Sequence, residues 1–391
     1  MTASLLCAIL AALPLGGAVD LAGSRGRPQS SDVSERVLFG LEWRAPIVRT
    51  GFERRVNASF GEPAVSERAH LVIVGSGEGD VRAFHLRAAK PAWTYAHGAA
   101  FETAVSLFDV GEGASAMELA ILGSRDGKLL ALESATGRLV WQTDVEGDVR
   151  AAASRAGALV VVATTQNRVV ALELATGKIV WSAGRPPPTG LTIVGHARPL
   201  VDGGTVYAAF SDGYVEAYGA GDGARRWSRP ISLKGGEFVD ADADPVIAKG
   251  RLFVASYSDG IFALDPKDGQ TIWTRPAAAV NRLALYDDQV LAASGDGFVW
   301  GLAQADGAPL HRTQLPHGLV SRMEVRDNLV VLAGGETGLV VLRADNGQPL
   351  QATGLPTRLS GDPTWSGNRV SVLSADGYLY SFVRGHRGTV Q

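Results

Sequence analysis

The chain of 391 residues contains a single cysteine, Cys7, and only three methionines. One thiol cannot form an internal disulfide, a cysteine zinc cluster or a Cys-x-x-Cys redox pair, so these are excluded. Lysine and arginine number 37 against 40 aspartates and glutamates, which leaves a formal net charge of −3. A balance of this kind offers no basic surface, so we expect no nucleic-acid partner. The seven histidines are scattered without metal-ligand spacing, and we expect no metal and no cofactor.

Glycine, by contrast, is abundant, at 48 of 391 residues. It does not recur at every third position, which excludes a collagen-like chain. Hydrophobic residues make up 46% of the sequence, and this excludes a low-complexity disordered chain. The glycine surplus therefore needs a structural explanation within a folded protein.

The N-terminal segment 3–18 is apolar and ends on small residues. It is shorter than the roughly 20 residues of a membrane-spanning helix, and Gly16 and Ala18 suit a signal peptidase site. We predict a signal peptide over 1–18 and a flexible linker over 19–35. A signal peptide usually has a lysine or arginine before its apolar run, and this chain has none there. A start codon assigned too far downstream would explain the missing basic residue. Lipidation at Cys7 would need a small residue before the cysteine and a longer apolar region upstream, and Leu6 and the six residues before Cys7 match neither requirement. Whether the protein carries a lipid anchor is left as an open alternative.

A repeat runs through the rest of the chain. Residues 124–141, 165–181, 211–227 and 258–273 each combine an Asp-Gly or similar turn, an alternating run, a second turn ending on glycine, and a tryptophan. Weaker copies lie at 77–93, 295–311, 336–351 and 375–382. A unit of about 40–48 residues with room for four strands is typical of a β-propeller blade. The sequence predicts an all-β, eight-bladed β-propeller over 36–391, whose hairpin turns explain the glycine surplus.

The last copy stops before its tryptophan strand, while residues 41–44 match that strand and have no blade before them. We therefore predict that an N-terminal strand completes the last blade, which closes the ring and removes both open edges. His311 and Gln351 take the tryptophan place in two copies. The tryptophans at this place are interpreted as structural anchors between blades: Trp43, Trp93, Trp141, Trp181, Trp227 and Trp273.

The repeat resembles that of pyrroloquinoline-quinone (PQQ) dehydrogenase-type propellers. Two segments between copies, 191–199 after the proline run 186–188 and 240–246, resemble the BamB family more closely. BamB is the B subunit of the outer-membrane β-barrel assembly machinery, and the resemblance covers about residues 40–383. It implies a non-catalytic periplasmic scaffold at the inner face of the outer membrane, which assists folding and insertion of outer-membrane β-barrel proteins.

In that family the two segments dock the periplasmic POTRA domains of BamA, the central barrel subunit. Carried over by position, Leu191 and Ile193 would be apolar contacts, and Asp240 and Asp242 acidic ones. Val194 stands where the family has a docking arginine, so the interface must differ there. Unfolded outer-membrane proteins are a further implied partner, and the propeller is expected to be a monomer within a complex. The competing interpretation places these apolar residues in an ordinary strand and the aspartates in a solvated connection.

Two other functions compete with this one. A PQQ-dependent dehydrogenase carries an adjacent cysteine pair under its cofactor, and Cys7 alone cannot supply it. A periplasmic interaction propeller with a different partner remains an alternative. The acidic run from Asp240 imitates a calcium loop, but Pro245 and Arg251 occupy the places of its glycine and glutamate.

Overall fold

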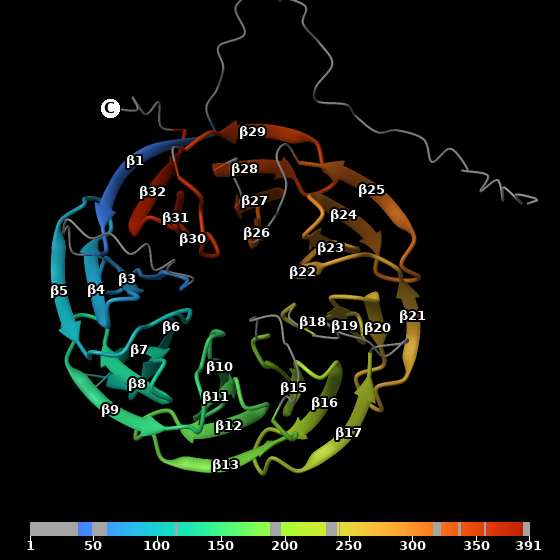
Figure 1. Ribbon diagram of the computed structural model, residues 1–391, viewed down its shortest axis with the longest axis horizontal. Helices are drawn as coiled ribbons and strands as arrows, with labels where there is room; N and C mark the ends of the chain where they lie inside the picture. Colours follow the sequence, from blue (N-terminus) through green and yellow to red (C-terminus); the bar gives the residue numbers. More distant parts are fainter. Residues whose placement is uncertain are drawn as a thin grey trace, which may run out of the picture.

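The computed structural model describes residues 38–48, 61–113, 116–187, 197–231, 241, 243–315, 322–334, 338–355 and 357–385. Within these ranges every named element is a strand, and the strands form eight four-stranded sheets around a central axis (Figure 1). The predicted eight-bladed all-β propeller is confirmed. A search of the same residues found no helix with the length and apolar character needed to cross a membrane.

Each blade is antiparallel and runs from an inner strand at the axis to an outer strand at the rim. We number the blades 1 to 8 along the chain. From axis to rim, blades 1 to 4 consist of β2 (Ala64–Ser66), β3 (Leu71–Gly75), β4 (Asp80–His85) and β5 (Pro91–Ala96); β6 (Ser106–Val110), β7 (Met117–Gly123), β8 (Lys128–Glu133) and β9 (Leu139–Asp144); β10 (Ser154–Ala156), β11 (Leu159–Thr164), β12 (Arg168–Glu173) and β13 (Ile179–Gly184); and β14 (Leu200–Asp202), β15 (Thr205–Ala209), β16 (Tyr214–Gly219) and β17 (Arg225–Pro230).

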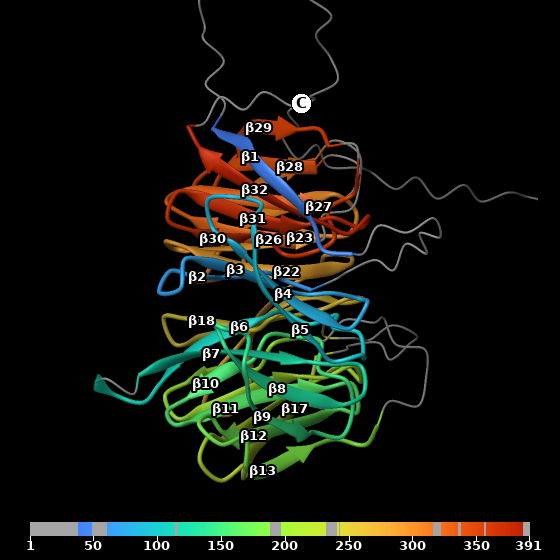
Figure 2. The same cartoon turned by 90° about the vertical axis from the view of Figure 1, so that its left-hand side faces the viewer.

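Blades 5 to 8 follow the same plan. They consist of β18 (Val246–Ala248), β19 (Arg251–Ser256), β20 (Gly260–Leu264) and β21 (Thr271–Arg275); β22 (Val280–Tyr286), β23 (Gln289–Ser294), β24 (Phe298–Ala303) and β25 (Pro309–Gln314); β26 (Arg322–Arg326), β27 (Leu329–Gly334), β28 (Gly338–Arg343) and β29 (Pro349–Thr353); and β30 (Thr364–Ser366), β31 (Arg369–Leu373), β32 (Tyr378–Arg384) and β1 (Phe39–Pro46). In the side view the β6–β7 hairpin projects past the neighbouring turns (Figure 2).

The ring closes as predicted. Strand β1 pairs antiparallel with β32, from Phe39 opposite Arg384 to Pro46 opposite Tyr378. The first and the last of the described strands therefore lie side by side in blade 8 (Figure 1). Both strands gain backbone hydrogen-bond partners in this way, because an open ring would leave two strands with unpaired edges.

The predicted turn glycines adopt left-handed backbone conformations. Gly127 of an Asp-Gly turn has φ 80°, and Gly137 of a second turn has φ 73°. A Cβ atom on Gly137 would lie 2.4 Å from the Trp93 ring of the preceding blade. Glycine is required there both for the backbone conformation and for the close approach of the indole.

The hydrophobic core lies between blades rather than within one of them. One cluster joins Trp141 of blade 2 to Val160 and Val170 of blade 3, and another joins Trp181 of blade 3 to Val206 of blade 4. The two central strands of each blade are almost entirely buried because each of their faces packs on a neighbouring blade. Propeller stability thus depends on contacts between successive blades.

Each tryptophan interpreted as an anchor donates its indole N–H to a backbone carbonyl of the next blade. The acceptor carbonyls and the N–O distances are Leu86 for Trp43 (3.3 Å), Ser134 for Trp93 (3.0 Å), Leu174 for Trp141 (3.0 Å), Ala220 for Trp181 (2.9 Å), Pro266 for Trp227 (2.9 Å) and Gln304 for Trp273 (3.1 Å). In blade 7, Gln351 replaces this contact, since its side-chain amide accepts from the N–H of Phe39 and donates to the Phe39 carbonyl.

Candidate functional site

The two predicted docking segments belong to connections that lead from the rim of one blade to the axis of the next. The first connection, 185–199, joins β13 to β14, and the second connection, 231–245, joins β17 to β18. The predicted contact residues and the departure from the family lie outside the described residues, so their placement stays a prediction: Leu191, Ile193, Val194, Asp240 and Asp242. What the structure describes is how the two connections begin and end.

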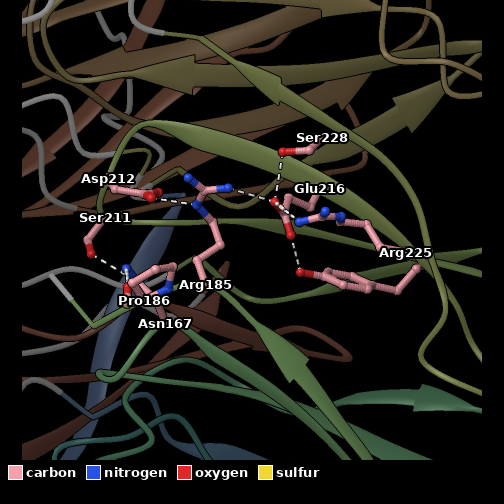
Figure 3. A network of polar contacts seen from close by, with 9 residues as sticks. Asn167, Arg185, Pro186, Ser211, Asp212, Glu216, Arg225 and Ser228 are labelled. Atoms are coloured by element: carbon pink, nitrogen blue, oxygen red, sulfur yellow. Dashed lines mark hydrogen bonds and ion pairs between the residues drawn. The ribbon is translucent and has the colours of Figure 1, made fainter.

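Arg185 begins the first connection, and its side chain is fixed by three groups of blade 4. Nη1 donates to Oε1 of Glu216 at 2.7 Å, and Nε donates to a carboxylate oxygen of Asp212. The guanidinium also stacks on the Tyr214 ring, with its central carbon 3.6 Å from the ring centroid. Figure 3 shows Arg185 between the two carboxylates. A planar guanidinium held by two carboxylates and an aromatic ring has a defined orientation.

Glu216 is fully buried and accepts from several donors besides Arg185. The Ser228 hydroxyl donates to Oε1 at 2.7 Å, and Nη1 of Arg225 lies 3.4 Å from the same oxygen. The Tyr218 hydroxyl donates to Oε2. Burial, followed by this hydrogen bond, raises the pKa of Tyr218, so its hydroxyl remains a donor at neutral pH. These donors compensate the carboxylate for its loss of water.

The residue after Arg185 is held from the other side, by blade 3. Nδ2 of Asn167 donates to the Pro186 carbonyl at 3.2 Å, and the backbone carbonyl of Asn167 accepts from the Arg185 N–H at 2.9 Å. Oδ1 of Asn167 in turn accepts from the Ser211 hydroxyl of blade 4 at 2.9 Å (Figure 3). The beginning of the first connection is therefore fixed by side chains of two blades.

The two connections meet where they end. The backbone N–H of Arg198, near the end of the first connection, donates to Oδ1 of Asp244 near the end of the second, at 2.7 Å. Both residues line a cavity of about 800 Å³ at the propeller axis, to which the inner strands of all eight blades contribute. The ends of the two connections consequently occupy fixed positions relative to each other.

Arg282 of blade 6 extends along this cavity to residues beside blades 8 and 1. Nη2 donates to Oδ2 of Asp362 at 2.9 Å and lies 3.9 Å from Oε1 of Glu62, beside the inner strands of blades 8 and 1. Burial, and then the nearby Asp362, raises the pKa of Glu62 well above its ordinary value. The same two causes raise the pKa of Glu324 to about 7, and burial raises that of Asp244. The cavity concentrates carboxylates around a guanidinium.

Nothing in the described part of the chain forms a group of three or more histidine, cysteine, aspartate or glutamate side chains suited to a metal ion. Two of the carboxylates that line the axial cavity, Glu62 and Asp362, face Arg282 instead. The arrangement is suited to fixing loops and joining blades.

Sequence reasoning missed Arg185, Glu216 and the Arg282–Asp362 pair. A signal for Glu216 was present, because the equivalent residues of blades 2 and 3 are Leu130 and Val170, both buried. An acidic residue at a strand position that is apolar in blades 2, 3 and 5 indicates a buried polar contact. No sequence pattern predicts the contact between Arg282 and Asp362, because 80 residues separate them in the chain.

Comparison with known proteins gives the family. The family model described as outer membrane protein assembly factor BamB matches residues 77–313 and 297–391. A relative named outer membrane protein assembly factor BamB in Xanthomonas campestris pv. campestris is 33% identical over 261 residues, which cover 63% of this chain and 62% of the relative. The BamB of Escherichia coli K12 is 36% identical over 205 residues, covering 49% and 52%. The chain thus spans between half and two thirds of the length of these relatives.

Solved structures agree on the fold. The crystal structure of BamB from Moraxella catarrhalis matches with a TM-score of 0.71 and 24% identity, covering 90% of this chain and 99% of that one. A quinohemoprotein alcohol dehydrogenase from Comamonas testosteroni matches with a TM-score of 0.66 and 14% identity, covering 90% and 77%. At these identities the likeness shows the propeller fold alone, and the dehydrogenase match carries no argument for its chemistry. On the strength of the family model, which spans most of the propeller, the chain belongs to the BamB family of PQQ-like repeat propellers.

Proposed function

We propose that the protein is a non-catalytic periplasmic scaffold of the outer-membrane β-barrel assembly machinery. It binds the POTRA domains of the central, BamA-like subunit through the first and second connections and assists folding and insertion of outer-membrane β-barrel proteins. It acts at the inner face of the outer membrane, as a monomeric propeller within the complex, and unfolded outer-membrane proteins are a further partner. The family to which the chain belongs supports this role, as do the names of its relatives.

The observation that carries the proposal is the hydrogen bond from Arg198 to Asp244. It joins the ends of two connections that come from different blades, so residues of both can meet one partner as a single surface. Leu191 and Ile193 would supply its apolar contacts, and Asp240 and Asp242 its charge complementarity. Scaffolding rather than catalysis is supported by the single cysteine, because the dehydrogenases of this repeat class need an adjacent pair.

A binding experiment with purified POTRA domains tests the proposal. Leu191→Ala and the double variant Asp240→Ala/Asp242→Ala should weaken binding by about tenfold or more, as expected for central contacts of a small interface. Leu310→Ala is the matched control, because Leu310 is an exposed leucine at the rim of blade 6 and should leave affinity unchanged.

The possible outcomes separate the candidate functions. Unchanged binding in both test variants would move the interface away from these connections. No binding by the wild-type protein would reject the assembly role and leave an interaction propeller with another partner. Turnover of a dye after reconstitution with PQQ and calcium would overturn the non-catalytic assignment.

A further inference from the structure

We propose that Glu216 is a positioning residue for partner binding: it holds Arg185 and so sets where the first connection leaves blade 3. The inference rests on the proposed function, because it concerns the connection that would carry the docking residues. Glu216 is fully buried in β16 and cannot contact a partner itself. Among the partners of Glu216, Arg185 is the residue that belongs to the first connection, so the effect on binding is expected to pass through Arg185.

The position of Glu216 in the repeat argues against a role in stability alone. Leu130, Val170 and Phe262 occupy the equivalent strand position in blades 2, 3 and 5, and all three are buried. Replacing a buried ion pair by apolar side chains is often neutral or stabilising, since the pair must first lose its water. An apolar residue would therefore pack blade 4 at least as well, and what the carboxylate adds is a directed contact.

That contact fixes the backbone at the start of the first connection. Glu216 and Asp212 hold two nitrogens of the Arg185 guanidinium, and Tyr214 covers its face. Asn167 meanwhile holds the Pro186 carbonyl. The side chain of Arg185 and the backbone at Arg185 and Pro186 are thus both restrained (Figure 3).

The other end of the first connection is also fixed, by the bond from Arg198 to Asp244. A segment with both ends fixed loses less conformational freedom on binding than one with a free end. Releasing Arg185 from Glu216 should consequently reduce affinity for the partner although no contact residue has changed.

The test compares two ion pairs of one propeller. Glu216→Gln keeps the shape of the side chain and removes the charge that holds Arg185. Glu42→Gln is the matched control, because Glu42 holds Arg369 through two hydrogen bonds of 2.9 and 3.0 Å in blade 8, far from both connections. We expect Glu216→Gln to weaken POTRA binding by about tenfold, and Glu42→Gln to leave it within twofold of wild type.

A further variant separates positioning from stability. Arg185→Met/Glu216→Leu places apolar side chains at both positions, as blade 2 does at Leu130, and should keep or raise the melting temperature while still weakening binding. Wild-type affinity in Glu216→Gln or in this double variant would overturn the proposal. An equal loss of affinity in Glu42→Gln would overturn it as well, because the effect would then be general.

Hydrogen exchange distinguishes failure of this inference from failure of the proposed function. The backbone amides of Arg185, Ala197 and Arg198 should exchange faster in Glu216→Gln than in wild type, and at the wild-type rate in Glu42→Gln. If the wild-type protein binds no POTRA domain, the assembly role fails, while exchange still reports whether Glu216 fixes this connection. Unchanged exchange in Glu216→Gln would overturn the inference whatever the partner.

Discussion

The N–H of Arg198 donates to the carboxylate of Asp244 across 2.7 Å, and through this bond blade 4 and blade 5 begin at adjoining points of the axis. The preceding residues of both chain segments are those that the BamB family resemblance assigns to partner binding. A backbone donor makes the bond independent of the side chain at position 198, so it depends on Asp244 alone.

Substitution of Asp244 should separate the bond from the charge. Asp244→Asn retains an oxygen that can accept from Arg198, whereas Asp244→Ala removes the acceptor, at a cost of about 1 kcal/mol. We therefore expect Asp244→Ala to weaken POTRA binding about fivefold more than Asp244→Asn does, measured by isothermal titration calorimetry. Equal losses would show that the negative charge matters and the bond to Arg198 does not.

The tryptophans between blades should differ in their contribution to stability. Trp141→Phe removes the donor to the Leu174 carbonyl and leaves that buried group unpaired, so we expect about 2–3 kcal/mol of destabilisation in urea unfolding. Trp300→Phe is the control, because the buried indole N–H of Trp300 has no acceptor among the described residues. Its loss should be about 1 kcal/mol or less. Similar losses in the two variants would contradict the anchor role.

Blade 6 allows a test of compensation within the repeat. The residue paired with the anchor tryptophan is alanine in blades 1 to 5, for example Ala263 opposite Trp273, whereas Gly301 lies opposite His311. A Cβ atom on Gly301 would lie 2.1 Å from Nε2 of His311, so Gly301→Ala should destabilise by about 1–3 kcal/mol.

The double variant Gly301→Ala/His311→Trp recreates the alanine–tryptophan pair of blades 1 to 5 and should recover most of that loss. The melting temperatures of the single and double variants give the coupling directly. Additive losses would show that blade 6 cannot accept the alanine–tryptophan pair.

The contribution of Glu324 to stability should fall as pH rises from about 4.5 to 7. The folded state raises the pKa of Glu324 from 4.5 to about 7, so between these values the folded protein binds more protons than the unfolded chain. A carboxyl with a raised pKa stabilises the fold while it is protonated, and this contribution is lost as pH rises through 7. Glu62 and Asp244, whose pKa values are also raised, act with the same sign.

Glu324→Gln should therefore flatten the pH dependence, by ~1–2 kcal/mol between pH 4.5 and 7.5 once screening by water in the cavity is allowed for. Urea unfolding at both pH values measures the difference. A wild-type slope retained in Glu324→Gln would assign the pH dependence to the other carboxylates.

The repeat explains why so much of the fold could be predicted and why the polar contacts could not. Turn glycines such as Gly127 and Gly137 recur in nearly every copy, so their spacing revealed the blades, the hairpins and the strand missing from the last copy. The Arg185–Glu216 and Arg282–Asp362 pairs occur once each and join different blades. A periodic pattern carries no information on such pairs, because each depends on which blades face each other in space.

The pairing of β1 with β32 also has a consequence for biosynthesis. Strand β1 pairs with β32, the last of the described strands to be made, so blade 8 stays incomplete until β32 has been synthesised. Blades 1 to 7 can form in order as the chain emerges, each packing on the one before it. A chain interrupted before Tyr378 retains an unpaired β1, exposed to proteolysis and to pairing with other chains. Ring closure therefore requires that the chain be synthesised as far as β32.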